Sequence, residues 1–222
     1  HQTLGITALL AEGKHVVVST GTSSGKSMIY NVPVLATILS SSVPRGQAAA
    51  SASASALYIF PTKALTQDQV STLSKLAISI EENGGTRIHV GTLDGDTLPG
   101  DRKSVTDHAH VVLTNPDMLS TTILPNHKSH ARLLSSLRYV VVDEAHVYRG
   151  VFGCHVSCVF RRLLRVCRLY GSDPQFVCCS ATIANPDEHF HMLVPSLGET
   201  RDVCVLTSDD DGAPKGRREF VL

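Results

Sequence analysis

The sequence HVVVSTGTSSGKS occupies residues 15–27 and joins an apolar run to a loop of small residues. Residues 16–18 are apolar at every position, as in a strand that a parallel sheet buries on both faces. A helix is expected directly after the loop, over residues 25–39. A strand, a short loop and a helix in this order form the first unit of an α/β domain.

Further apolar runs of strand length follow along the chain. The expected strands are residues 57–60, 88–90, 111–113, 139–142, 176–179 and 203–206. The expected helices are residues 65–80, a segment near Met118, and residues 130–136, 152–169 and 187–193. This alternation predicts the α/β class, with an open, mostly parallel sheet that carries helices on both faces.

The composition narrows the class of protein. The chain has 222 residues, 42% of them apolar and 18% charged, with a formal net charge of zero. A chain of this length and composition can bury its own core. Its zero net charge excludes nucleic-acid binding that is driven by overall positive charge, although a local basic groove is compatible with it.

No apolar run approaches the roughly 20 residues of a membrane span, so no membrane contact is expected. The six cysteines match no zinc pattern and are expected to be buried free thiols in a reducing compartment.

Two stretches lack the apolar periodicity of strands and helices. Residues 40–56 are rich in serine and alanine and are expected to form a solvated surface loop. Residues 208–222 combine acidic residues with glycine, proline and arginine, and are expected to be a linker toward a domain that the chain does not contain. Residues 1–207 are therefore predicted to form one domain.

The loop after the first strand is predicted to bind the phosphates of a nucleotide. Its residues are Thr20, Gly21, Thr22, Ser23, Ser24, Gly25, Lys26 and Ser27. Small residues let main-chain amides surround phosphate oxygens, and the start of the following helix adds its positive end. Lys26 is expected to reach the β- and γ-phosphates, and Ser27 to hold Mg²⁺. Thr20 stands where the strict pattern has glycine, and GKS alone also fits an ordinary glycine-serine turn.

An acidic pair follows the apolar run 137–142. Asp143 and Glu144 would open into the crevice at the carboxyl ends of the strands, where such sheets bind ligands. Asp143 is suited to hold Mg²⁺, and Glu144 to polarise the water that attacks the γ-phosphate. The alternative is a solvated strand end, which the phosphate loop upstream disfavours. Together the two motifs predict a site for ATP and Mg²⁺.

GKS followed by DEAH at residues 143–146 resembles the first RecA-like domain of superfamily-two helicases, which are P-loop NTPases. PTKAL at 61–65, TNPD at 114–117 and SAT at 180–182 resemble further motifs of these proteins in the same order. The resemblance implies contacts of Thr62, Lys63 and Thr114 with a nucleic-acid backbone. It also implies that Ser180, Ala181 and Thr182 couple hydrolysis to movement, that Gln2 reads the adenine edge, and that His146 links the γ-phosphate site to the other motifs.

The finer pattern is similar to the Hrq-type branch of the RecQ-like helicases. FPTKAL at 60–65, DGDT at 94–97, LTNPDM at 113–118 and DEAHVYRGVFG at 143–153 carry this similarity. The branch implies ATP-driven 3′ to 5′ translocation on single-stranded DNA, a role in DNA repair, and a nuclear location. The second RecA-like domain, with its arginine finger, is expected to follow residues 208–222, so the chain alone should bind nucleotide weakly and not unwind DNA.

Other interpretations stay open at this point. Arg149 could contact DNA or only shape the turn between Gly150 and Gly153. The same core serves RNA helicases and duplex translocases. A non-catalytic nucleotide-binding scaffold is disfavoured by the intact Lys26 and Glu144, and a small-molecule kinase by the SAT and DEAH motifs.

Overall fold

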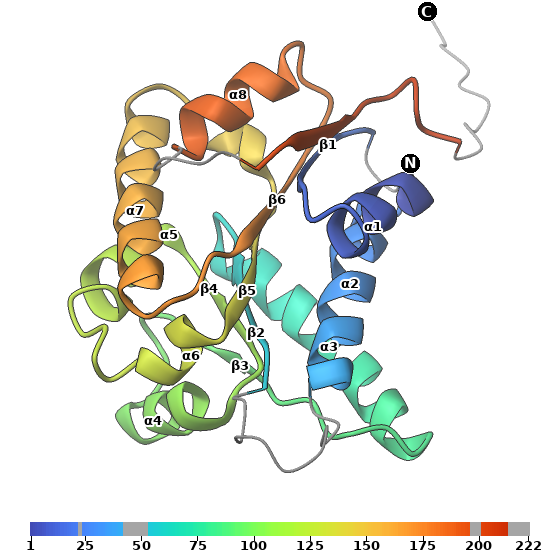
Figure 1. Ribbon diagram of the computed structural model, residues 1–222. Helices are drawn as coiled ribbons and strands as arrows, with labels where there is room; N and C mark the ends of the chain where they lie inside the picture. The colour runs from blue at the N-terminus through green and yellow to red at the C-terminus, as the bar shows by residue number, and fades with distance from the viewer. Residues whose placement is uncertain (22–23, 42–52, 196–200, 213–222) are drawn as a thin grey trace, which may run out of the picture.

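The computed structural model describes residues 1–21, 24–41, 53–195 and 201–212. Within these residues one seven-stranded sheet has the order β3-β4-β2-β5-β6-β1-β7, and every neighbouring pair is parallel (Figure 1). The strands are β1 (His15–Ser19), β2 (Ser55–Ile59), β3 (Val90–Thr92), β4 (Val111–Thr114), β5 (Leu137–Val142), β6 (Gln175–Ser180) and β7 (Val203–Leu206). The predicted open parallel sheet is confirmed.

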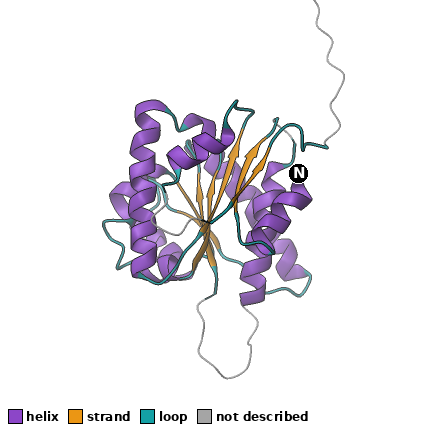
Figure 2. Cartoon of the chain, turned by 45° about the horizontal axis from the view of Figure 1, so that its top comes forward, coloured by secondary structure: helices purple, strands orange, loops and turns teal. Residues whose placement is uncertain are grey.

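Helices cover both faces of the sheet, and Figure 2 shows the strands between two helical layers. One layer consists of α1 (Gln2–Leu10), α2 (Lys26–Ser41) and α3 (Lys63–Glu82). The other contains α4 (Pro99–His108), α5 (Pro116–Met118), the π-helical turn η1 (Leu119–Ile123), α6 (Ala131–Ser135), α7 (Gly150–Leu169) and α8 (Pro186–Leu193). A 3-10 turn, η2 (Ala145–Val147), lies between β5 and α7.

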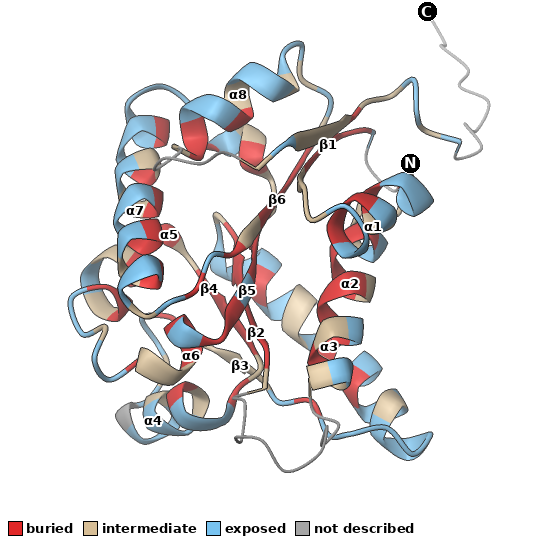
Figure 3. Ribbon diagram, in the orientation of Figure 1, coloured by how far each residue is buried: buried red, intermediate tan, exposed pale blue. Residues whose placement is uncertain are grey.

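The central strands are buried on both faces, which Figure 3 shows in red. Leu57 and Ile59 pack into the core that includes α6 and α7, whereas Tyr58 and Phe60 point into the core that includes α2 and α3. Because both cores need apolar side chains, successive residues of β2 are apolar and the run does not alternate.

The third expected strand lies two residues away from its predicted position. The sequence predicts residues 88–90, whereas β3 pairs with β4 from Val90 to Thr92. Ile88 is buried although it precedes the strand, so its apolar side chain serves packing and not strand pairing. The sequence also gives no signal for α1 or α4, because α4 is mostly polar and α1 has no one-sided apolar stripe.

The predicted boundaries of the surface loop 40–56 are wrong at both ends. Ser40 and Ser41 form the end of α2, and Ser55 and Ala56 begin β2 as buried residues. Ser55 fits a buried strand because its hydroxyl donates to the main-chain oxygen of Leu133 at 2.8 Å. Residues 42–52 lie outside the described residues.

The described part of the predicted linker, residues 208–212, lies against the start of the chain. His1 Nδ1 and Asp211 Oδ1 are 3.2 Å apart, and both side chains are nearly buried. Residues 213–222 lie outside the described residues.

Free thiols are confirmed at every described cysteine. The predicted burial is confirmed for Cys167, Cys178 and Cys179. It is wrong for Cys154 and Cys158, which are exposed because they lie on the outer side of α7. In the described ranges, no helix has both the length and the apolar character that a membrane span requires.

His15, at the start of β1, joins two strands as an uncharged acceptor. Its Nδ1 accepts the main-chain amide of Phe176 at 2.9 Å. Burial lowers the pKa of His15 from 6.5 to about 4; the charges of Arg201 and His191 lower it further, and that of Asp173 opposes them. An imidazolium cannot accept this hydrogen bond, so the fold requires the neutral ring.

We therefore predict that acidification destabilises the domain through His15. The unfolded chain takes up the proton first, so the stabilisation is complete above pH 6.5 and is lost as the pH falls toward about 4. The loss amounts to roughly 3 kcal/mol at most. Urea unfolding at a series of pH values measures it. His15→Asn keeps an acceptor without a proton equilibrium, so its pH dependence should be flatter; parallel curves for both proteins would contradict the assignment.

Candidate active site

The predicted motifs converge because three neighbouring strands end at one edge of the sheet. The register pairs Ser19 with Ser180, and Val142 with Cys178, so β1, β6 and β5 end at nearly the same level. The phosphate loop follows β1, the SAT segment ends β6, and the acidic pair follows β5. Segments far apart in the sequence thus meet at the carboxyl edge, where parallel sheets bind ligands.

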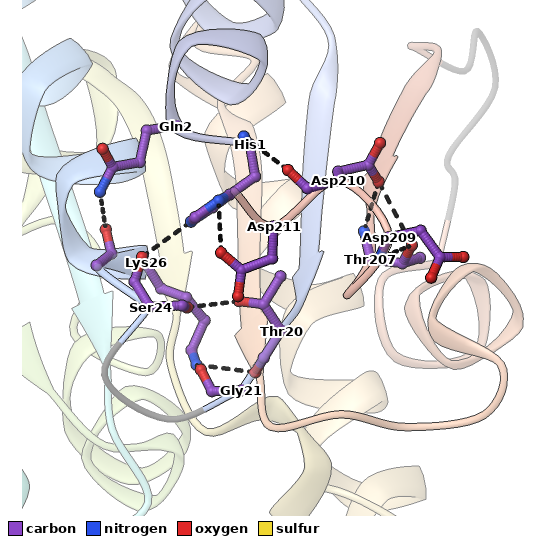
Figure 4. Close-up of polar contacts among 11 residues, drawn as sticks. His1, Gln2, Thr20, Gly21, Ser24, Lys26, Thr207, Asp209, Asp210 and Asp211 are labelled. Atoms are coloured by element: carbon purple, nitrogen blue, oxygen red, sulfur yellow. Dashed lines mark hydrogen bonds and ion pairs between the residues drawn. The ribbon is translucent and has the colours of Figure 1, made fainter. Parts of the chain in front are cut away.

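The phosphate loop is braced by hydroxyl groups at its base. Thr20 Oγ1 and Ser24 Oγ are 2.7 Å apart, and both residues are buried (Figure 4). Thr20 replaces the glycine of the strict pattern, and its side chain closes the loop by this bond. Thr22 and Ser23 lie outside the described residues.

Lys26, the first residue of α2, lies with its ammonium group against the loop. Its Nζ donates to the main-chain oxygens of Thr20 at 3.0 Å and Gly21 at 2.7 Å. The positive charge is therefore held at the position that the sequence predicts for phosphate binding. Gly25 precedes it with a φ of +78°, a left-handed conformation that side chains disfavour.

The start of α1 is bonded to the end of the same loop. Gln2 Nε2 donates to the main-chain oxygen of Gly25 at 3.2 Å, and His1 Nε2 lies 3.0 Å from that of Ser24 (Figure 4). The sequence singles out Gln2 but not His1, because the role of His1 depends on Asp211 at the other end of the chain.

The two carboxylates differ in surroundings. Asp143 Oδ1 accepts the main-chain amide of Glu144 at 2.8 Å, and Oδ2 accepts the hydroxyl of Tyr30 at 3.1 Å. Burial raises the pKa of Asp143, and these two hydrogen bonds oppose that rise. No motif of the sequence includes Tyr30. The signal that could have indicated it is its spacing of three residues from Ser27 on one helix.

Glu144 has a strained main chain. Its φ is +50°, and no other non-glycine residue in the described ranges has a positive φ. Such conformations gather at functional sites, where surrounding contacts impose them. Its Oε2 lies 3.3 Å from Nδ1 of His146. His189 of α8 lies 2.9 Å from the main-chain oxygen of Ala145 and so supports the same turn.

The SAT segment is bonded to the end of β1. Ser19 Oγ donates to the oxygen of Ala181 at 3.4 Å and accepts the amide of Ile183 at 3.0 Å. Ser180 Oγ donates to the same Ala181 oxygen at 2.8 Å, and Thr182 is exposed. In the described part of the chain, no hydrogen bond joins Ser180 or Thr182 to the acidic pair.

The residues predicted to contact nucleic acid do not share one environment. Thr62 caps α3, accepting the amide of Leu65 at 3.5 Å, and the exposed Lys63 lies 2.6 Å from Asp96. Arg149 is exposed at the start of α7. Thr114 is only 1% exposed, and its hydroxyl donates to the oxygen of Leu93 at 2.7 Å. The predicted contact between Thr114 and a nucleic-acid strand therefore does not fit the structure.

A family model of DEAD/DEAH box helicases matches residues 1–189. The chain belongs to this family. It is 48% identical over 211 residues to the uncharacterised ATP-dependent helicase YprA of Bacillus subtilis, a match that covers 95% of this chain and 25% of YprA. It is 39% identical over 224 residues to the ATP-dependent helicase HRQ1 of Saccharomyces cerevisiae, covering 100% of this chain and 19% of HRQ1.

Solved structures agree with this assignment. The DUF1998 helicase MrfA, crystallised with DNA and AMPPNP, matches with a TM-score of 0.83 and 44% identity, covering 97% of this chain and 27% of MrfA. The fold of this helicase-family domain is thus RecA-like, and the resemblance to Hrq-type helicases is confirmed. The chain spans a quarter or less of the length of these two curated relatives.

The left-handed Gly25 gives a prediction about the stability of the phosphate loop. A Cβ atom there would meet only the end of the flexible Gln2 side chain, which can move aside, so the backbone strain dominates the cost. Gly25→Ala should lower the free energy of unfolding by about 1–2 kcal/mol, the cost of placing a side chain on a left-handed backbone. Denaturant unfolding measures this loss.

Gly84 offers a matched control, because its φ is +83° and no heavy atom would lie within 4 Å of an added Cβ. Gly84→Ala should therefore show the backbone cost alone. Because Gln2 can move aside, both variants should lose about the same free energy of unfolding. A much larger cost at Gly25 than at Gly84 would show that the Gln2 side chain is held in place and cannot move aside.

Proposed function

We propose that this domain is the ATP-hydrolysing motor domain of a DNA helicase. The observation that carries the proposal is the approach of α2 to the acidic pair: Tyr30, one turn after the phosphate loop, is bonded to Asp143 across 113 residues of sequence. The loop for phosphates and the carboxylates for metal and water thus belong to one site. ATP-dependent helicases among the relatives, and AMPPNP in the MrfA crystal, support the same function.

The loop and Lys26 would bind the phosphates of ATP. Lys26 now donates to neutral carbonyl oxygens, and charged phosphate oxygens form stronger bonds with an ammonium group. Main-chain amides at the start of α2 would add further donors. The side-chain amide of Gln2 lies beside the loop and would face the adenine base of ATP.

The donor set at the edge of the sheet fits Mg²⁺. Ser27, in the first turn of α2, and Asp143 supply oxygen atoms, which this cation prefers. Tyr30 of the same helix touches Asp143, so the turn that carries Ser27 also faces this carboxylate. Bound Mg²⁺ would neutralise charge on the phosphates.

Glu144 would orient the attacking water and accept its proton. Its left-handed main chain turns the residue away from the course of β5, and His146 lies against its carboxylate. The main-chain conformation therefore places this carboxylate at the end of the strand, where a general base would have to lie.

The remaining parts of the proposal concern the whole protein. MrfA was crystallised with DNA, and the Hrq-type resemblance supports 3′ to 5′ translocation on single-stranded DNA and a role in DNA repair. Residues 208–222 would lead to a second RecA-like domain, whose arginine would complete the site. A nuclear location stays a prediction.

The test is ATP hydrolysis by this chain, and by a chain extended through the second domain, with single-stranded DNA, with RNA and without either. We expect turnover only in the extended chain, stimulated more by DNA than by RNA. Glu144→Gln should lower turnover by about 100-fold or more and leave nucleotide binding intact.

Glu82→Gln makes the same chemical change at the far end of α3 and should keep full activity. Hydrolysis that survives Glu144→Gln would exclude this residue as the base. An extended chain that binds ATP without hydrolysing it would support a scaffold, and stronger stimulation by RNA would support an RNA helicase.

Lys63 gives a separate prediction about strand binding. Its ammonium group is paired with the exposed Asp96, which would compete with a phosphate for it. Asp96→Asn should raise affinity for single-stranded DNA by roughly three- to fivefold at low salt, and Lys63→Ala should lower it. Fluorescence anisotropy of a labelled oligonucleotide measures both.

Asp107→Asn removes the same charge at the far end of α4 and should leave affinity unchanged. An equal gain in both variants would mean that only net charge matters.

A further inference from the structure

Tyr30 has a role that none of the recognised motifs assigns to it. It lies on α2, three residues after Ser27, and its side chain is 1% exposed. Its hydroxyl nevertheless finds a partner, since it donates to Asp143 Oδ2 at 3.1 Å. Burial raises the pKa of the phenol, as does the charge of Asp143, so the hydroxyl keeps its proton and remains a donor.

The hydrogen bond fixes the orientation of the Asp143 carboxylate. One oxygen accepts the amide of Glu144 and the other accepts Tyr30, so rotation about the carboxylate axis breaks both bonds. A carboxylate has about four lone-pair positions, so two occupied ones leave others for a cation. The plane of the carboxylate is thus set before any cation arrives.

We propose that Tyr30 is a positioning residue that holds Asp143 toward the cation which Ser27 also binds. The inference rests on the proposed function of the site. Residues three apart lie on one side of a helix, so a single turn of α2 carries both the hydroxyl ligand and the group that orients the carboxylate ligand. The phosphate loop and the acidic strand are joined by this contact.

Tyr58 is a neighbour with which this role can be compared. It packs edge to face against Tyr30, with ring centroids 5.4 Å apart, and is fully buried. Its hydroxyl donates to Asn31 Oδ1 at 3.0 Å, also on α2. Tyr58 therefore shares the packing of Tyr30 and the anchoring of the helix, but its hydroxyl bonds to Asn31 and not to Asp143.

The experiment compares Tyr30→Phe with Tyr58→Phe, each of which loses only a hydroxyl. Binding of a fluorescent ATP analogue is titrated with Mg²⁺ and, separately, in the presence of a chelator. In Tyr30→Phe we expect the Mg²⁺ concentration for half-maximal enhancement of binding to rise about tenfold or more, the effect typical of lost partners of metal ligands. Binding without Mg²⁺ should stay unchanged, and Tyr58→Phe should behave as the wild type in both titrations.

Each other outcome has a defined meaning. An unchanged Mg²⁺ requirement in Tyr30→Phe overturns the inference, as does an equal change in Tyr58→Phe. A loss of affinity for the ATP analogue that is equally large with and without Mg²⁺ also overturns the inference, because that pattern indicates a damaged helix. A wild-type chain whose nucleotide binding does not respond to Mg²⁺ contradicts the proposed function instead. Thermal unfolding of both variants checks that they are folded.

Discussion

The parallel direction of the strands is the constraint on which the site depends. Because β5, β6 and β1 are neighbours and run the same way, the segments after them emerge at one edge. A single antiparallel strand among them would send one motif to the opposite end of the sheet. The buried, apolar character of these strands therefore serves the chemistry as well as the stability of the domain.

Several parts of the site are connected by a side chain of one segment and a main-chain oxygen of another. Ala181 accepts Ser19 and Ser180, Ala145 is bonded to His189, and Gly25 accepts Gln2. Such contacts fix the path of each loop whatever side chain the accepting residue carries. Asp143 uses both of its carboxylate oxygens, one for the amide of Glu144 and one for the hydroxyl of Tyr30.

The sequence predicts the parts of this molecule that local patterns determine. Buried strands are continuous apolar runs, and Lys26 and Glu144 stand in motifs whose spacing follows from their chemistry. Features that depend on residues distant in the sequence are missed. Ile88 is apolar because it packs in the core, and Thr114 is buried with its hydroxyl bonded to the oxygen of Leu93. Tyr30 acquires its partner Asp143 only when the end of β5 lies beside α2.

The hydrogen bond between the hydroxyls of Thr20 and Ser24 couples the contributions of these two residues to stability. Each hydroxyl satisfies the other in a buried place, so a chain that lost one of them would keep an unpaired polar group at a cost of about 1–3 kcal/mol. A chain that lost both would avoid that penalty. The two positions are therefore coupled in the sense of a double-mutant cycle, and among related sequences they are expected to change together rather than singly.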